Sequence, residues 1–553
     1  MKRLSSLALI SLLVLCSVSF AQLAHEDYER LLDTGLTNDE PYSYALMREA
    51  EDSKNKVELL ADAVKFSPDL PAPYFDLSIA SLPDVFSSIR YGLEGLRAYG
   101  RNFWGSFSLA GLAMASALVS LALAGALVVL LRLPMSVPLL AHDINESRAK
   151  MLLPLLLLPA ALGGPLLFIG GALIIVGIYL RKSGKFMVFA FLAVLAAAPL
   201  LLALANSMLS AASSPRMKAI VAVNEGMDND YAISMLGDEK GFAERFSYAL
   251  ALKRVGRYGE AAEIYTGLAR ENPSSVKVPN NLATTYSAMG QAARAEDYLE
   301  QAIDVKPTAQ ILYNLSQIYR GALDYATGDR YYDEAAALDR NLVSRYTALA
   351  SAHPNRFLID MTYTMPELWW QAMKYRREIL APFPIGKFPA SGLAVALIVF
   401  AAVYYFSSRS RAFRCSRCDR IVCNICSRDS RWGQMCPDCY GALVKVQDHD
   451  RQRRVDALLQ AYEHRSGKRK TVKTLSFLPP GIAHIYAGRV LSGTLLLWAF
   501  GFFAAALWLN PFIGTGMAGL SHWWLNPLLV LAMAVEYVFT TLYINGRLDS
   551  GWL

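Results

Sequence analysis

The chain has 553 residues, of which 54% are hydrophobic and 18% are charged, and its net charge is +7. Its mean hydropathy is +0.27, whereas about 25% of the residues in an ordinary soluble domain are charged. These values exclude a disordered or fibrous chain and argue against a fully soluble one. Because the apolar residues are gathered in blocks, we expect membrane-spanning helices that separate soluble modules.

The N-terminus has the pattern of a secretory signal. Met1-Lys2-Arg3 is basic, residues 4–18 are apolar, and small residues precede a cleavage point after Ala21. This pattern predicts a signal peptide over residues 1–21 and places the next segment outside the cytoplasm. Residues 22–105 are polar and have a helical pattern, so we expect an extracytoplasmic helical segment there.

Three apolar stretches follow this segment. Residues 106–131 and 186–205 each approach or exceed the roughly 20 apolar residues that a membrane-spanning helix needs. Residues 151–180 are also apolar but are broken at Gly163-Gly164-Pro165. Because the basic residues Arg181, Lys182 and Lys185 mark the cytoplasmic side, we expect an even number of passes here, as a tight hairpin or re-entrant pair of helices that turns at this break. The alternative is a single kinked helix, with the repeat region in the cytoplasm and the cysteines exported.

Residues 207–385 contain an internal repeat with a period of 34. Gly256 and Gly290 are 34 positions apart. The same spacing relates three further pairs: Ala261 and Ala295, Tyr265 and Leu299, and Pro273 and Pro307. A third copy, one residue shorter, carries Leu315, Tyr319, Tyr331, Tyr332 and Ala335. Small residues let paired helices approach closely, and the proline stops the second helix of each pair.

This repeat resembles the tetratricopeptide (TPR) superfamily over residues 240–340, and residues 61–80 resemble the junction of two further repeats. The resemblance implies an α-solenoid whose concave groove binds a protein or peptide partner. The side chains expected to line the groove are Asn280, Asn281, Tyr313 and Asn314. The alternative is that the groove packs against the protein's own N-terminal domain. Residues 356–375, with Trp369-Trp370, are expected to form a closing helix over the last repeat.

Another predicted span, residues 388–406, precedes a cluster of six cysteines. They form three C-x2-C pairs: Cys415 and Cys418, Cys423 and Cys426, and Cys436 and Cys439. A C-x2-C turn directs two thiolates at one ion, and two such turns complete a tetrahedral zinc site. We expect one structural Zn²⁺ site in a zinc-ribbon-like module, held by Cys415, Cys418, Cys436 and Cys439. Cys423 and Cys426 either replace one of those pairs or help to hold a second metal, and redox or iron–sulfur chemistry is the alternative.

Charge predicts the side of the membrane on which each module lies. Residues 407–474 hold 16 Lys and Arg against 7 Asp and Glu, a local charge of +9. Positive charge beside spans marks the cytoplasmic face, and a reducing compartment favours metal-binding over disulfide-bonded cysteines. We therefore expect residues 407–474 in the cytoplasm and residues 207–385 outside it. A basic juxtamembrane surface explains the arginines around the cysteines better than nucleic-acid binding does.

Residues 475–553 hold two apolar segments after Pro480-Gly481, Tyr486 and Gly488. These residues resemble the opening of TM2-like two-span membrane domains, although Ala483 stands where that pattern has its second glycine. Glu536 lies near the middle of the last span, where a carboxylate is costly and marks a functional or helix-pairing position.

The predicted fold class is therefore mainly α, with multi-pass membrane helices, an extracytoplasmic TPR solenoid and a small cytoplasmic zinc module. This arrangement resembles bacterial membrane-anchored TPR proteins with a CxxC-rich module and a hydrophobic tail. We find no nucleophile–base, HExxH or Walker pattern. The sequence favours a non-enzymatic scaffold of the bacterial inner membrane; the alternatives are a component of a transport or secretion system and a zinc- or redox-sensing signalling protein.

Overall fold

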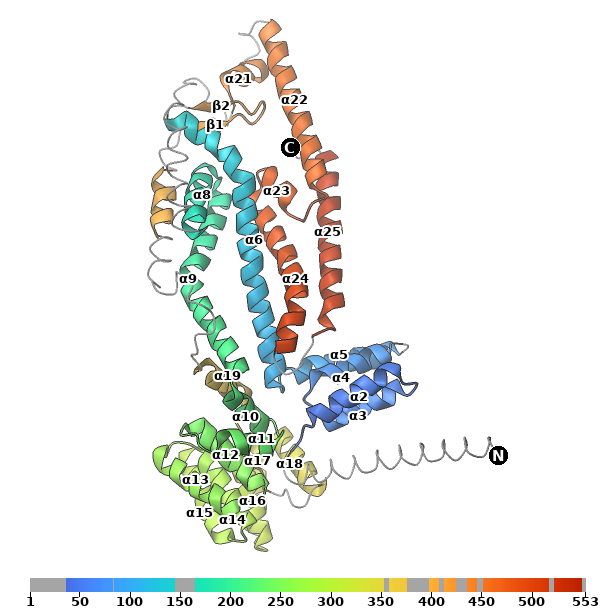
Figure 1. Cartoon of the computed structure of the whole chain (residues 1–553), viewed down its shortest axis with the longest axis vertical. Coiled ribbons are helices and arrows are strands. Elements are labelled where there is room, and N and C mark those ends of the chain that lie inside the picture. The colour runs from blue at the N-terminus through green and yellow to red at the C-terminus, as the bar shows by residue number, and fades with distance from the viewer. Residues whose placement is uncertain are drawn as a thin grey trace, which may run out of the picture. The chain divides into compact units, whose positions relative to one another are not determined.

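The computed structural model describes residues 36–82, 84–144, 165–352, 358–374, 397–406, 412–423, 435–444, 451–516 and 522–549. Within these residues the protein is mainly α-helical, with one two-stranded sheet. The chain forms two compact units (Figure 1). Met1–Phe107 and Ser207–Arg377 form the first unit, and Ser108–Asn206 and Glu378–Leu553 form the second. The predicted signal peptide, residues 1–21, lies outside the described residues.

The first unit begins with two helical hairpins. They consist of α2 (Glu40–Asp52), α3 (Lys56–Phe66), α4 (Pro71–Ala80) and α5 (Val85–Ala98). Asp39 and Asp84 cap α2 and α5, because their side chains accept hydrogen bonds from backbone N–H groups of the first turn. Buried Leu46, Ala63 and Phe66 form the core of the first hairpin. The predicted helical segment 22–105 is therefore helical from Glu40 to Ala98, apart from the short turns between helices.

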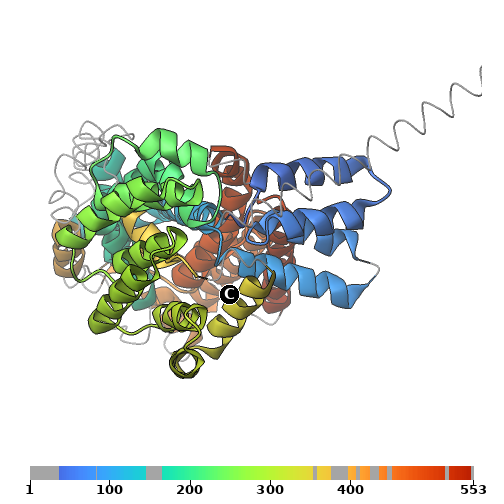
Figure 2. The same cartoon turned by 90° about the horizontal axis from the view of Figure 1, so that it is seen from below.

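The repeat region is a solenoid of paired helices, seen in green to yellow in Figure 2. Its helices are α10 (Pro215–Asn224), α11 (Asn229–Leu236), α12 (Phe242–Arg254), α13 (Tyr258–Glu271), α14 (Lys277–Ala288), α15 (Ala292–Val305), α16 (Ala309–Gly321), α17 (Tyr325–Leu338) and α18 (Arg340–Ala352). Gly256 and Gly290 turn the chain inside the first two predicted repeats with φ values of +85° and +75°. Glycine adopts this left-handed conformation without the strain that a side chain adds. The period of 34 is thus explained by one helix pair per repeat.

The third repeat makes the same turn with a different residue. Leu323, which is not a glycine, takes a φ of +68° there. Gly328 then allows α17 to approach α16 closely, because a Cβ at this position would lie 3.1 Å from the Ser316 backbone oxygen. The shorter third copy therefore keeps the repeat geometry.

The end of the repeat region differs from the sequence prediction. Of the expected closing helix over residues 356–375, the described residues are helical only in α19 (Met365–Lys374). Residues 358–364 are not helical, and the last repeat packs against α18 through Val343 and Tyr346. The prediction of one helix over the last repeat was wrong, because residues 358–364 make their hydrogen bonds with side chains of the groove, as described below.

The second unit contains long apolar helices. Among the described residues, three are long and apolar enough to cross a membrane: Phe103–Asp143 in α6 (Phe103–Ile144), Val490–Phe512 in α24 (Val490–Gly516) and Leu525–Leu548 in α25 (Leu525–Asp549). They include the predicted span 106–131 and the two C-terminal spans. Of the predicted span 388–406, the described part is the short apolar helix Leu397–Phe406.

Two further helices occupy the region of the predicted hairpin. α8 (Pro165–Tyr179) begins at the proline of the Gly-Gly-Pro break, and α9 (Lys182–Ser213) contains the predicted span 186–205. The first arm of the predicted hairpin lies in residues 145–164, outside the described part of the chain. The number of passes in residues 151–180 therefore stays a prediction.

In the part of the chain that the structure describes, a small sheet and three helices lie between Leu397–Phe406 and α24 in the sequence. β1 (Ala412–Arg414) pairs with β2 (Ile421–Cys423) in an antiparallel sheet, in which Phe413 lies opposite Val422. α21 (Pro437–Leu443) and the long basic α22 (Arg451–Leu475) follow, and α23 (Ile482–Tyr486) leads into α24. Gly481 and Gly493 touch at this entrance, since a Cβ on Gly481 would lie 2.0 Å from the Gly493 oxygen.

Candidate functional site

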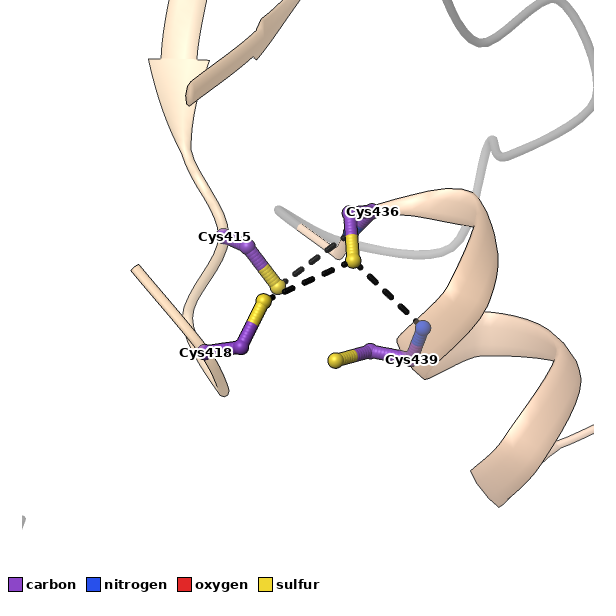
Figure 3. Close-up of side chains that lie close together, drawn as sticks. All are labelled: Cys415, Cys418, Cys436 and Cys439. Atoms are coloured by element: carbon purple, nitrogen blue, oxygen red, sulfur yellow. Dashed lines mark hydrogen bonds between the residues drawn. The ribbon is translucent and has the colours of Figure 1, made fainter. Parts of the chain in front are cut away.

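Four of the six clustered cysteines converge in the structure. Cys415, Cys418, Cys436 and Cys439 point toward one another (Figure 3), and their Sγ atoms all lie within 4.8 Å of one another. Cys415, Cys436 and Cys439 are buried, and Cys418 is partly buried. These are the four residues that the sequence favours for a single closed site.

The local fold positions each pair of thiols. Cys415 and Cys418 lie in the turn between β1 and β2, where the N–H of Cys415 donates to the Arg420 oxygen. Asp419 closes the turn with a φ of +63°. Cys436 is the N-cap of α21, and its Sγ accepts a hydrogen bond from the N–H of Cys439. A strand turn and a helix start therefore present two C-x2-C pairs to one point.

The spacing of the four sulfurs is compatible with a metal site. Zinc binds thiolates at about 2.3 Å, which places the sulfurs of a tetrahedral site about 3.8 Å apart. The Sγ atoms of Cys418 and Cys436 lie 3.6 Å apart. Four thiolates suit zinc or an iron–sulfur centre, and a site closed by four protein ligands is structural in type.

Hydrogen bonds to sulfur already favour the charged form of one thiol. Burial raises the pKa of Cys415, but backbone N–H groups, including those of Cys418 and Cys436, outweigh this effect and bring the pKa down to about 7. Burial raises the pKa of Cys436 to about 11. Because a metal ligand must be deprotonated, a bound cation would supply the charge that holds all four as thiolates.

The remaining pair of cysteines is only half described. Cys423 ends β2 and is buried, but it is not part of the four-sulfur cluster. Cys426 lies outside the described residues. A second metal that uses this pair therefore stays a prediction.

The cysteine module is attached to α6 and to neighbouring acids. The N–H of Ala412 donates to Asp143 Oδ1 at 2.8 Å, and Arg414 donates to the Met135 oxygen at 3.2 Å. Arg414 also pairs with Asp419, and Arg420 pairs with Asp438. Two of the arginines around the cysteines therefore stabilise the module itself.

The predicted groove residues are all buried against the protein's own chain. Asn280, Asn281 and Asn314 have no exposed surface, and Tyr313 is 1% exposed. Asn281 Oδ1 accepts from the N–H of Met361 at 2.8 Å, and its Nδ2 donates to the Met361 oxygen at 2.9 Å. Asn314 makes the same pair of bonds with Ile359, at 2.8 Å each.

A third asparagine completes the row. Asn224, at the end of α10, accepts from the N–H of Tyr363 at 2.7 Å. Asn281 and Asn314 occupy matching positions in the second and third repeats, and Ser247 occupies this position in the first. The Ser247 hydroxyl accepts a hydrogen bond from Asn224 Nδ2 at 2.9 Å. The row therefore binds every second residue of the segment Leu358–Thr364, here called the groove segment.

Charged side chains also hold the groove segment. Lys253 pairs with Asp360, which also accepts from Thr284 Oγ1 at 2.6 Å. Lys277 donates to the Thr362 oxygen at 2.7 Å and pairs with Glu367 of α19 at 2.6 Å. Burial raises the pKa of Asp360, but Lys253 and Thr284 outweigh it, so the pKa lies below its usual value.

Tyr313 contributes differently from the asparagines. Its ring packs against Tyr346 of α18, with ring centroids 5.3 Å apart, and belongs to the apolar cluster that includes Ile359. The sequence predicts these four residues as partner-binding, and in the structure they contact the groove segment of the same chain. The sequence does not predict this occupant. The missed signal is the strict alternation of Ile359, Met361 and Tyr363 with polar residues, which is typical of an extended segment.

A cavity of about 440 Å³ borders the groove segment in the first unit. Arg101, Asp69, Lys253 and Asp360 are among the residues that line it. Arg101 pairs with Asp69 at 2.7 Å, and Lys253 pairs with Asp360. The protein therefore neutralises these charges internally.

Glu536 lies within α25. Both of its carboxyl oxygens are buried and have no hydrogen-bond partner among the described residues. Its neighbours Val535 and Val538 are exposed on the surface of the unit. If α25 crosses a membrane, this position is costly for a charged carboxylate.

One comparison with known proteins bears on the groove. The tetratricopeptide repeat family model matches residues 253–318. This range runs from the end of α12 into α16 and includes Asn280, Asn281 and Asn314. No curated protein matches the chain. TPR repeats generally mediate protein–protein interaction, so the match supports that class of function for the solenoid.

Proposed function

We propose that this protein is a non-enzymatic, multi-pass membrane scaffold that binds protein partners through its TPR groove. The observation that carries the proposal is the row of asparagines, which holds an extended backbone by paired hydrogen bonds. Such bonds give affinity for the main chain of an extended segment, and the pockets for its alternate side chains give specificity. The cysteine module would hold structural Zn²⁺ and order the other side of the membrane.

The partner would be an extended segment with alternating apolar side chains. Ile359 and Met361 are buried in the groove, and Asp360 between them meets Lys253. A partner segment with the same alternation and an acidic residue at the middle position would make the same contacts. It would have to displace the groove segment, because both use the same asparagine amides.

The groove segment therefore competes with a partner for the same asparagine side chains of the groove. A tethered segment has an effective concentration in the millimolar range when its linker is short and flexible. A free partner of micromolar affinity would bind poorly until the groove segment is released. Partner binding and release of the groove segment would thus be coupled.

A competition experiment tests this proposal on the full-length protein in detergent micelles. The probe is a fluorescent peptide with the sequence of residues 356–366, and the readout is fluorescence anisotropy. Met361→Pro removes the N–H that Asn281 accepts and leaves the groove side chains unchanged. We expect weak binding to the wild type, strong binding to Met361→Pro, and no binding when Asn281→Ala is added.

A scrambled peptide is the control for unspecific binding. If folded Met361→Pro binds neither peptide, the groove is a closed structural core and the proposed partner site is wrong.

For location, we propose the bacterial inner membrane, with the repeat region outside the cytoplasm and residues 407–474 inside. The support is the charge of +9 in that segment and the three apolar helices. Labelling of whole cells with a membrane-impermeant amine reagent tests this arrangement. Exposed Lys306 should react in intact cells, whereas exposed Lys470 should react only after the membrane is opened.

A further inference from the structure

Helix α5 presents an apolar face to its surroundings. Val85, Phe86, Ile89, Leu93 and Leu96 are 50–88% exposed, and Phe86 is the most exposed of them. At 3.6 residues per turn, these five side chains fall within an arc of about 100°. Leu82, just before the helix, is also 60% exposed. A contiguous exposed apolar face of this kind marks an interaction surface.

The opposite face of α5 is fixed by close packing. A Cβ on Gly95 would lie 3.0 Å from the Phe75 ring of α4. Ser78 of α4 donates to the Ser88 oxygen at 2.7 Å. Because the small and polar residues face α4, the helix cannot rotate its apolar face inward without losing these contacts.

The chain continues from α5 directly into the longest apolar helix. α5 ends at Ala98 and α6 begins at Phe103. The N–H of Asn102 donates to the Ala98 oxygen, and Asn102 Oδ1 accepts from the Gly105 N–H at 2.7 Å, so a short turn joins the two helices. Four linking residues span at most about 14 Å. If α6 enters a bilayer, α5 lies at its surface.

Two arginines border the apolar face. Phe86 lies at one edge of the apolar arc. On the helical wheel, Arg97 and Arg90 lie just beyond this edge, at most about 40° from Phe86, and both are exposed. Basic residues beside an apolar stripe are typical of helices that lie in the membrane interface, because they reach anionic headgroups.

We propose that α5 lies in the plane of the membrane interface, with Phe86, Ile89 and Leu93 inserted among the acyl chains and Arg90 and Arg97 among anionic headgroups. This inference rests on the membrane embedding of α6 in the proposed function. It adds a lipid-binding surface that fixes the N-terminal hairpins against the bilayer.

Lipid photocrosslinking in the full-length protein tests the inference. Benzoylphenylalanine replaces one residue at a time, and the protein is reconstituted in vesicles of phosphatidylglycerol and phosphatidylethanolamine. Phe86 is the test position, and Tyr325, another exposed aromatic residue, is the matched control on the solenoid. Leu130 of α6, which is 67% exposed, reports membrane embedding. The readout is the mass of lipid adducts.

We expect lipid adducts at positions 86 and 130 and at least tenfold fewer at position 325. Adducts at position 130 without adducts at position 86 would overturn the interfacial role of α5 while leaving the membrane scaffold intact. A crosslink from position 86 to protein would also overturn the interfacial role of α5, and it would identify this face as a protein docking site. Absence of lipid adducts at position 130 would overturn both the membrane embedding and the inference.

Discussion

The side-chain amide of Asn314 pairs with the backbone of Ile359, accepting from its N–H and donating to its oxygen at 2.8 Å each. Asn281 does the same with Met361. Two asparagines at matching repeat positions thus bind residues two apart in the groove segment, as the alternation of an extended chain requires. The groove segment satisfies its backbone through side chains of the solenoid in place of a helix or sheet.

Removal of either asparagine should release the groove segment. Asn281→Ala removes the hydrogen-bond partner of the Met361 N–H and of the Met361 oxygen. Each buried polar group left without a partner costs about 1–3 kcal/mol. We expect amide hydrogen exchange in residues 359–363 to become faster by about 30-fold or more, which corresponds to about 2 kcal/mol. Asn341→Ala, on the exposed side of α18, is the control and should leave these exchange rates unchanged. Unchanged exchange in Asn281→Ala would show that the paired bonds do not hold the segment.

The ion pair of Asp360 should make the groove depend on pH. Lys253 holds the pKa of Asp360 below its usual value of 3.8 despite burial, so the ionised carboxylate stabilises the folded state. This contribution is complete above pH 3.8 or so and is lost as the pH falls through the lower folded pKa. Asp360→Asn should therefore lower the thermal unfolding midpoint at pH 7, and the difference from wild type should shrink below about pH 4. In a Lys253→Gln background Asp360→Asn should no longer lower the midpoint, because the buried carboxylate has lost its cation there. A lowering as large as in the wild type would contradict the ion pair.

The cysteine cluster should hold one zinc ion per chain. Cys415→Ser and Cys439→Ser each remove a ligand of the four-sulfur cluster, so elemental analysis of the purified full-length protein should show loss of zinc. Cys423→Ser lies outside this cluster and is the matched control, which should keep its zinc. Iron, or loss of metal in Cys423→Ser, would contradict this ligand set.

The sequence predicted those features whose residue pattern occurs more than once, namely the helix pairs and the C-x2-C turns. Gly256 and Gly290 revealed the helix pairs because the same turn recurs every 34 residues. The sequence favours Cys415, Cys418, Cys436 and Cys439 because C-x2-C spacing directs two thiols at one point, and in the structure their Sγ atoms lie within 4.8 Å of one another. Topology, the signal peptide and enzymatic inactivity stay predictions.

The groove segment was missed because it occurs once and its partners are distant in sequence. Asn314 and Ile359 are separated by 45 residues. The predicted closing helix over residues 356–375 includes residues 358–364, whose alternation of apolar and polar side chains is typical of an extended chain. A tertiary interaction decided the local conformation there, and no local pattern states which groove an extended segment will occupy.

Gly481 should be irreplaceable at the turn that leads into α24. It has a φ of +96°, and a Cβ there would lie 2.0 Å from the Gly493 oxygen. Gly481→Ala should therefore lower the thermal midpoint of the full-length protein strongly. Gly488→Ala separates the effect of the positive φ from the effect of the close approach. Gly488 has the same φ, but a Cβ added there would meet no described atom within 4 Å. It should cost only the left-handed strain of about 1–2 kcal/mol. Equal effects in both variants would show that close approach to Gly493 contributes nothing.

Substitution of Glu536 distinguishes a role of this side chain in helix pairing from a role in transport. Its two oxygens have no partner among the described residues, and a charged carboxylate inside a span is costly. If α25 crosses a membrane as proposed, an uncharged side chain costs less at this position, and glutamine supplies one. We expect Glu536→Gln to rescue a deletion strain fully and to keep the wild-type thermal midpoint, because it loses only the ability to ionise. A folded Glu536→Gln protein that fails to rescue would instead support proton or ion transfer at this position, and with it the alternative of a transport component. Thr540→Val, one turn further along α25, is the control for general loss of polarity in this helix.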